Sequence, residues 1–546
     1  MTLLVILTAL VISMAITPLM IRLAPRLRMV DLPDPRKVHA KAIPRVGGIG
    51  IVLGSLIGLL LWLPAEPWLN SYLFGSLVLL AFGAADDSME LGHYPKFIGQ
   101  IVAAAAVVYW GDVWVANVPF LAEPLVPAIG KPFTVFALVG VMNAMNHSDG
   151  LDGLAGGESL LSMVAIAFLA YLAGGTGVVM LAAAVIGGVF GFLRFNTHPA
   201  QVFMGDSGSQ FIGCSVGVLA ILLTQQVNTS LSMALPLLII GLPIVDILAV
   251  FGQRIQGGMN WFRATRNHVH HRLLDIGFKH HQVVVLIYSA QALLVLSAVL
   301  LAYESDFAVV ATYVLVCSAV FALIVAAERS GWRFAGAKPA DAPAPAAEGD
   351  APDEQSRRAW QSLPLLFIKL TIPAYLLVAG LSVAAVPIDF AIVAVCVLGL
   401  AAASAIPWAI GVRLMLLRVA LYLGAACQVF LARIVDPTNL GAAIEGGYFI
   451  LLGLAVALTL RIEGARGFRT TPLDFLMVFI VVVAAALSGL TFSGGLASAE
   501  VVVRLAVLFY AIELVISGNR GKDGALSRWS VMAASLLLLV KNMALV

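Results

Sequence analysis

Long uncharged apolar runs recur along the chain, and short polar segments separate them. Before residue 330 they predict eleven helices, at about 2–21, 47–64, 71–86, 97–110, 132–147, 158–173, 177–193, 209–225, 232–251, 283–302 and 308–326. Each run is part or all of a segment that can cross a bilayer, which takes roughly 20 residues of helix. The pattern therefore predicts an all-α, polytopic transmembrane protein.

The pattern breaks at residues 336–362, where alanine, proline and acidic residues replace the apolar runs. Such a segment cannot bury an apolar face, so we expect a disordered cytoplasmic linker. About seven more apolar helices follow between 363 and 543, with no histidine and no dense polar motif. We therefore predict a membrane domain over 1–335 that carries the chemistry, the linker, and an additional transmembrane domain over 363–546.

Composition excludes the soluble classes. Of the 546 residues, 61% are hydrophobic and 11% are charged, whereas an average soluble chain is roughly 45–50% apolar and about 25% charged. The four cysteines lie singly in apolar runs, so neither a disulfide framework nor a cysteine metal cage is expected. We expect the protein to lie in a lipid bilayer, and we predict no nucleic-acid partner.

Charge placement predicts the orientation in the membrane. Segment 22–45 is rich in basic residues: Arg22, Arg26, Arg28, Arg36, Lys37, Lys41 and Arg45. The positive-inside rule puts this segment in the cytoplasm and the N-terminus outside, with the first helix retained. Alternation then places all nine histidines at the cytoplasmic face: His39, His93, His147, His198, His268, His270, His271, His280 and His281. One membrane face is therefore predicted to hold nearly all the chemistry.

Two acidic and amide motifs lie at helix ends on this face. Asp86 and Asp87 end the third apolar run, where adjacent carboxylates call for a cation such as Mg²⁺. Asn143, Asn146 and Asp149 recur every three residues and share one helix face, and the glycines that follow let backbone approach a ligand. The plainer interpretations are a solvated helix end and a helix C-cap.

A third motif places Asp206 in a Gly-Asp-Ser-Gly turn that opens the next helix. The free N–H groups of a helix start attract an anion, and Asp206 there either caps the helix or holds a cation. Charges at membrane depth cost about 2.5–3.5 kcal/mol each. A cluster of them is therefore a functional hypothesis.

Two basic segments complete the set. Loop 252–282 contains many hydrogen-bond donors: Arg263, Arg266, His268, His270, His271 and Arg272. These donors can hold phosphates or sugar hydroxyls, and zinc is not favoured because no cysteine or acidic ligand lies beside them. In the first inside loop Lys37, His39 and Arg45 suit an anionic headgroup or a substrate phosphate. A positive-inside loop and a membrane-surface anchor are the plainer interpretations, but together the five motifs predict phosphoryl transfer onto or off a lipid.

The motifs read PRKVHAKAIPRVGGIGI, DDSME, NAMNHSDGLDGLAGG, FNTHPAQVFMGDSGS and NHVHHRL. In this order and spacing the set resembles the polyprenyl-phosphate N-acetylhexosamine-1-phosphate transferase superfamily, over about residues 1–330. The closer resemblance is to its WecA-like branch, because Glu90 closes DDSME where the phospho-MurNAc-pentapeptide translocase branch usually has lysine. The resemblance does not cover 336–546.

The resemblance implies a reaction. HexNAc-1-phosphate, with GlcNAc-1-phosphate as the first candidate, passes from a UDP-HexNAc to undecaprenyl phosphate, with release of UMP. It also implies Mg²⁺, or Mn²⁺ in its place, and a site at the cytoplasmic face of a bacterial inner membrane, where the product initiates O-antigen or a related glycan. The alternatives are a translocase-type transferase and a polytopic transporter of an anionic solute. The choice of sugar, the downstream glycan, the role of 363–546 and a homo-oligomeric state stay open.

The resemblance also implies residue roles. Asp86 and Asp87 form the catalytic pair, and Asp206 with Asn146 binds the metal. The implied substrate-binding residues are Asn143, Asp149, Asp152, Lys37, His39, Arg45, Lys96, His268, His270, His271 and Arg272.

Overall fold

The computed structural model describes residues 2–33, 42–258, 267–333, 354–383, 386–406, 410–432, 442–463, 495–517 and 525–543. The described residues up to 333 form one compact unit, and those from 354 onward form a second.

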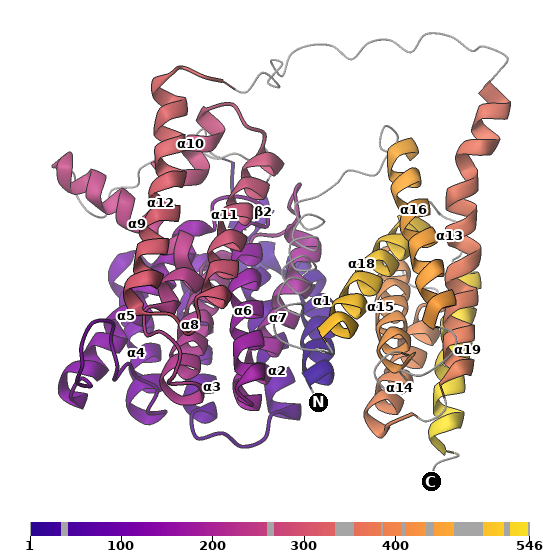
Figure 1. The fold of residues 1–546 in the computed structure, drawn as a ribbon, viewed down its shortest axis with the longest axis horizontal. Helices are drawn as coiled ribbons and strands as arrows, with labels where there is room; N and C mark the ends of the chain where they lie inside the picture. The colour runs from indigo at the N-terminus through magenta and orange to yellow at the C-terminus, as the bar shows by residue number, and fades with distance from the viewer. Residues whose placement is uncertain are drawn as a thin grey trace. The chain divides into compact units, whose positions relative to one another are not determined.

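The first unit is helical. Its elements are α1 (Thr2–Leu27), β1 (Val30–Asp31), β2 (Ile43–Pro44), α2 (Gly47–Trp62), α3 (Leu69–Met89), α4 (His93–Ala105), η1 (Ala106–Trp110), α5 (Pro127–Ser148), α6 (Leu154–Leu172), α7 (Thr176–Asn196), α8 (Gly205–Ile221), η2 (Leu222–Val227), α9 (Leu235–Gln256), α10 (Val269–Asp275), α11 (His280–Leu300) and α12 (Asp306–Arg329) (Figure 1). The strands β1 and β2 form one antiparallel pair, and η1 and η2 are π-helical continuations of α4 and α8.

All eleven helices predicted in this half are present. Their ends differ by a few residues, because hydropathy marks where the apolar surface stops and not where helical hydrogen bonding stops. For example, α3 continues past Asp86 to Met89 and ends where Glu90 takes a left-handed conformation with φ 50°. The short helix α10 lies inside the predicted loop 252–282 and was not predicted.

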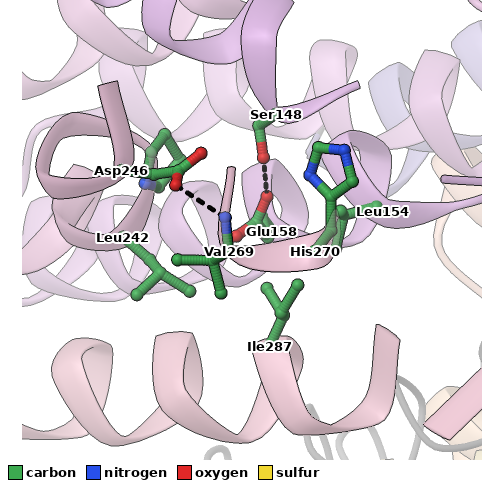
Figure 2. A pocket seen from close by; sticks show the side chains of 9 residues that line it. Ser148, Leu154, Glu158, Leu242, Asp246, Val269, His270 and Ile287 are labelled. Carbon is green, nitrogen blue, oxygen red and sulfur yellow. Dashed lines mark hydrogen bonds between the residues drawn. The ribbon is translucent and has the colours of Figure 1, made fainter. Parts of the chain in front are cut away.

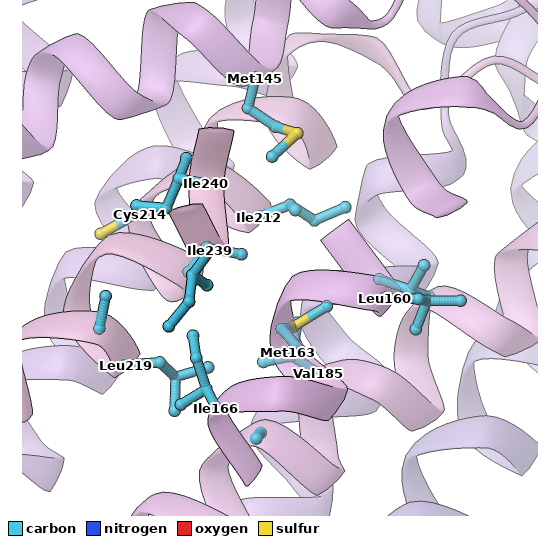
Figure 3. Close-up of a cluster of buried hydrophobic side chains, with 14 of the residues drawn as sticks. Met145, Leu160, Met163, Ile166, Val185, Ile212, Cys214, Leu219, Ile239 and Ile240 are labelled. Carbon is cyan, nitrogen blue, oxygen red and sulfur yellow. The ribbon is translucent and has the colours of Figure 1, made fainter. Parts of the chain in front are cut away.

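Membrane-spanning potential confirms the predicted class. Ten of the described helices are long and apolar enough to cross a membrane, nine of them in the first unit. The helix α8 contacts α2, α3, α5, α6, α7 and α9, and its whole apolar stretch is buried. Figure 3 shows part of this interior, where Met145, Ile212 and Ile239 from three helices pack together. The first turn of α8 is therefore held from several sides.

The second unit contains α13 (Glu354–Ser382), α14 (Ile388–Ala403), α15 (Ile410–Phe430), α16 (Ala442–Glu463), α18 (Gly495–Ser517) and α19 (Ala525–Met543). The helix α13 includes the last nine residues of the segment predicted as a disordered linker, so that prediction is wrong for 354–362. Good helix formers extend the apolar helix outward although they carry no apolar periodicity. The rest of the predicted linker, and part of the range in which seven helices were predicted, lies outside the described residues.

Two ion pairs hold the helices of the second unit together. The guanidinium of Arg504 on α18 lies 2.6 Å from Glu445 on α16, which also accepts the hydroxyl of Tyr375. Arg418 on α15 pairs through two nitrogens with Glu513 on α18, at 2.8 and 3.0 Å. Because each charge has a partner of opposite sign, the cost of placing it among apolar helices is reduced.

Candidate active site

Four helix ends of the first unit bring the acidic and amide motifs together. Asp86 and Asp87 lie in the last turn of α3, Lys96 in the first turn of α4, Asn146 in the last turn of α5 and Asp206 in the first turn of α8. The structure thus brings these side chains together at one end of the helices.

Asp206 is the centre of this group. Its carboxylate accepts hydrogen bonds from the amide of Asn146, at 2.9 Å, and of Gln210, at 3.3 Å. The ammonium of Lys96 forms an ion pair with the same carboxylate and donates to the amide oxygen of Asn146 at 3.1 Å. The Asn146 amide also donates to Ser209 at 2.8 Å. A carboxylate oxygen of Asp206 and the amide oxygen of Asn146 thus face the positive charge of Lys96. Hard cations prefer oxygens of these two kinds.

Asp87 makes different contacts from its neighbour Asp86. It is 7% exposed, and it accepts the backbone N–H of Asp206 at 2.8 Å and both the N–H and the hydroxyl of Ser207, at 3.2 and 3.0 Å. Gly205 has a φ of +72°, and a Cβ on it would lie 2.5 Å from the Asp87 carboxylate. Asp87 therefore caps the start of α8, which leaves the less buried Asp86 facing Asp206.

Glycines allow the helices to approach this turn closely. A Cβ at Gly83 of α3 would lie 2.4 Å from the Cα of Ser207, and a Cβ at Gly48 of α2 would lie 2.2 Å from the backbone nitrogen of Gly208. Small residues permit such backbone contact between membrane helices. The position of Asp206 thus depends on Gly83 and Gly48, which have no functional side chain.

The loop between α5 and α6 adds two carboxylates. Burial, together with the charges of Asp206, Asp152 and Asp87, raises the pKa of Asp149 to about 7. Burial acts to raise the pKa of Asp152 too, but the hydrogen bond from His198 and the charge of His280 hold it below its usual range. Asp149 is therefore part of the crowded acidic group, whereas Asp152 lies against His198 and His280.

Asp152, His198 and His280 form a cluster that the sequence analysis did not single out. Nδ1 of His198 lies 2.7 Å from the Asp152 carboxylate, and the backbone N–H of Asp152 donates to Nε2 of His280 at 3.2 Å. Their ligand atoms lie within 4.8 Å of one another. However, the two rings are stacked with centroids 4.2 Å apart, whereas ligands of one tetrahedral ion point at it from different directions.

The histidines of loop 252–282 are partly interior residues. His270 is 4% exposed and packs on Gly150, where a Cβ would lie 2.2 Å from its Nε2. Burial and the charge of His271 lower the pKa of His270 to about 3. With Glu158, which accepts the Ser148 hydroxyl, it lines a small cavity (Figure 2). His270 is thus placed to support the loop.

Comparison with known proteins identifies related sequences. The profile of glycosyl transferase family 4 matches residues 69–224. The chain is 33% identical over 289 residues, 52% of this chain and 81% of the relative, to a probable undecaprenyl-phosphate N-acetylglucosaminyl 1-phosphate transferase of Bacillus subtilis (strain 168). The chain belongs to this family of polyprenyl-phosphate N-acetylglucosaminyl 1-phosphate transferases.

Two further relatives support the same branch of these transferases. One is the undecaprenyl-phosphate alpha-N-acetylglucosaminyl 1-phosphate transferase of Salmonella typhi, 31% identical over 281 residues, which are 50% of this chain and 76% of the relative. Another is the decaprenyl-phosphate N-acetylglucosaminephosphotransferase of Mycobacterium leprae, 34% identical over 315 residues, which are 52% of this chain and 79% of the relative. The predicted family and its WecA-like branch are confirmed.

Several residues predicted to bind substrate in this transferase have protein partners. Asn143 donates to Gln100 at 2.8 Å, and Arg45 pairs with Asp31 beside the β1–β2 ladder. The guanidinium of Arg272 is bound by the Glu328 carboxylate at 2.8 and 2.6 Å. Lys37 and His39 lie outside the described residues. The roles of all these residues stay predictions.

Two carboxylates near the candidate active site were missed by the sequence analysis. Asp246 lies in the apolar helix α9, and Glu158 lies in α6. The available signal was the presence of a lone carboxylate inside a membrane-spanning run, which marks a functional candidate by itself.

Proposed function

We propose that this chain transfers N-acetylglucosamine-1-phosphate from UDP-N-acetylglucosamine to undecaprenyl phosphate. An oxygen of the lipid phosphate attacks the sugar-linked phosphorus, the bond from that phosphorus to the bridging oxygen breaks, and UMP leaves with that oxygen. The observation that carries the proposal is the convergence of Asp86, Asn146 and Asp206 with Lys96 at one end of the helices, in a chain of this family.

Asp206 and Asn146 are the residues that would hold Mg²⁺. Their side-chain oxygens already face the ammonium of Lys96, so the site is built for a positive charge, and these oxygens suit a hard divalent ion. When bound, the ion would neutralise phosphate charge and polarise the diphosphate.

Asp86 is the member of the aspartate pair that is available to the acceptor. The oxygens of Asp87 accept three hydrogen bonds from the start of α8. A phosphate monoester has a second pKa of about 6, so the lipid phosphate is largely a dianion at pH 7 and needs orientation more than deprotonation. We assign this orienting role to Asp86. Lys96 is close enough to the same group to supply positive charge to either phosphate.

The proposed location is a bacterial inner membrane, with the N-terminus outside and the site at the cytoplasmic face. The basic segment 22–45 supports this orientation. A transporter role is less well supported, because the residues proposed for catalysis and metal binding, Asp86, Asn146 and Asp206, lie at helix ends and not at the middle of the spans.

The test is UMP release by the purified protein with undecaprenyl phosphate, Mg²⁺ and UDP-N-acetylglucosamine. We expect release to require the lipid and the metal, and Asp206→Asn to lower the rate by about 100-fold or more. Other UDP-HexNAc donors then define the choice of sugar. If folded protein releases no UMP from any of these donors, the transferase proposal is wrong.

A further inference from the structure

Asp246 is a buried carboxylate on α9 for which the proposed reaction has no role. It is 7% exposed, and both of its oxygens are engaged at the start of α10. One oxygen accepts the backbone N–H of Val269 at 2.9 Å, and the other lies 2.8 Å from Nδ1 of His268. Figure 2 shows this hydrogen bond from Val269 to Asp246, two of the residues that line the small cavity. Asp246 thus ties the histidine segment to a membrane-spanning helix.

Asp246 caps α10, and the side chain at the N-cap position does not. His268 occupies the N-cap position and makes no side-chain hydrogen bond to the helix. The first N–H groups of a helix have no partner within it, and Asp246 satisfies that of Val269. The ring of His268 is therefore not used to cap the helix.

The contact with Asp246 determines which ring nitrogen of His268 carries a proton. A carboxylate oxygen only accepts hydrogen bonds, so Nδ1 of His268 must be the donor in this 2.8 Å contact. In the neutral ring Nε2 then holds a lone pair and is an acceptor. A second group that fixes the tautomer of a functional histidine is a common device in enzyme sites.

His268 lies beside the transferase site. Its ring is stacked with His147, with centroids 5.3 Å apart, and with His270 at 5.7 Å. His147 directly follows Asn146 in the last turn of α5. Asp246 and His268 therefore connect α9 to the end of α5 that carries a proposed metal ligand.

We propose that Asp246 is a positioning residue for the transfer reaction. It fixes the ring plane and the tautomer of His268, so that Nε2 accepts a hydrogen bond from a hydroxyl group of the sugar nucleotide. This inference rests on the proposed function, in which His268 contacts the donor.

The test compares Asp246→Asn, His268→Gln and the double variant, each as the full chain. In Asp246→Asn the amide oxygen still accepts the N–H of Val269, but the NH₂ group faces Nδ1 of His268 and favours the opposite tautomer. We expect kcat/KM for UDP-N-acetylglucosamine to fall about 10- to 100-fold with an unchanged unfolding temperature. The double variant should be no less active than His268→Gln, because one residue acts through the other.

The matched control is Asp306→Asn. Asp306 accepts the N–H of Ala234 at 3.2 Å and the Ser232 hydroxyl at 2.6 Å, and therefore also anchors a helix start. It should keep the wild-type kcat/KM. Wild-type activity in Asp246→Asn or His268→Gln, or additive losses in the double variant, would overturn the proposal and leave a purely structural cap.

A second measurement does not depend on the folding of Asp246→Asn. The ¹⁵N spectrum of histidine-labelled wild type, minus that of His268→Gln, reports the tautomer of His268. Protonation at Nδ1 is expected, and protonation at Nε2 would overturn the proposal. An inactive wild-type protein would instead contradict the proposed transferase function, so the two failures are distinguishable.

Discussion

Lys96 holds the positive charge at the centre of the acidic group. Its ammonium contacts the two side chains proposed to bind Mg²⁺, Asp206 and Asn146. One set of oxygens cannot coordinate the ion closely and keep both contacts with the lysine. We therefore expect Lys96 and the metal to compete.

Lys96→Met tests this competition. The variant should be more strongly stabilised by Mg²⁺ than the wild type, and a tenfold tighter Kd corresponds to about 1.4 kcal/mol. Thermal unfolding in detergent over a series of Mg²⁺ concentrations measures the difference. Lys131→Met is the control, since Lys131 pairs with Asp112 at 2.7 Å, away from the proposed ligands. An equal or smaller Mg²⁺ response in Lys96→Met would show that the lysine does not compete.

The two neighbouring aspartates should respond differently to substitution. In Asp87→Asn one amide oxygen cannot accept the three hydrogen bonds that Asp87 receives from Asp206 and Ser207. We expect the free energy of unfolding to fall by about 1–3 kcal/mol, and activity to fall with it. Asp86→Asn should lose activity with a smaller change in stability, because its amide oxygen still accepts the N–H of Leu91. Equal destabilisation in denaturation experiments would contradict this division of roles.

At the scale of elements, the site depends on how closely α3 approaches α8. In Gly83→Ala the new methyl group would overlap the backbone of Ser207, and backbone cannot move aside as a flexible side chain can. We expect a loss of about 1–3 kcal/mol in stability and a fall in UMP release. Unfolding and activity assays measure both.

The control for this prediction is Gly140→Ala in α5. A Cβ there has no neighbour within 4 Å, so the substitution should keep activity and stabilise the helix by up to about 1 kcal/mol. Similar behaviour of the two alanine variants would mean that the contact between α3 and α8 does not position the site.

The packing of α10 should make stability depend on pH. The folded chain holds the pKa of His270 at about 3, below the ordinary 6.5. The unfolded chain therefore binds a proton that the folded chain excludes, and stability falls as pH drops below 6.5, by up to about 1.4 kcal/mol per pH unit. Unfolding temperatures at pH 7.5 and 5 should differ more for the wild type than for His270→Gln. An identical difference would rule out His270 as the cause.

At the scale of the whole molecule, the first unit has its own apolar core. The large buried cluster runs from Val5 to Ile324 and includes only residues of this unit. The residues proposed for transfer also come from it alone. We therefore expect the first unit to build the site without the second.

A chain that ends at Arg333 tests this independence. It should fold and release UMP within about twofold of the full-length rate, because a unit with its own apolar core contributes its stability independently. Activity per mole of folded protein, with full-length protein as the control, measures the effect. A large loss of activity from folded, truncated protein would assign the second unit a part in substrate binding.

The sequence by itself determined the class of the protein and the set of its motifs. Apolar runs are local signals, and a run near 20 residues has few ways to satisfy its backbone in lipid other than a helix. The eleven helices of the first half were therefore predictable, as was the gathering of Asp86, Asn146 and Asp206 at one face. Local signals failed where polar helix formers extend an apolar helix, as at Glu354.

Only the tertiary structure decided what each polar residue does. Asp87 caps a helix 119 residues later in the chain, Lys96 faces Asp206, Asp246 holds His268 and Arg272 is bound by Glu328. Each of these pairs depends on which helices become neighbours and how closely glycines let them approach. Motif spacing contains no information on such long-range contacts, because it reports the chemistry that a segment offers and not the partner that meets it.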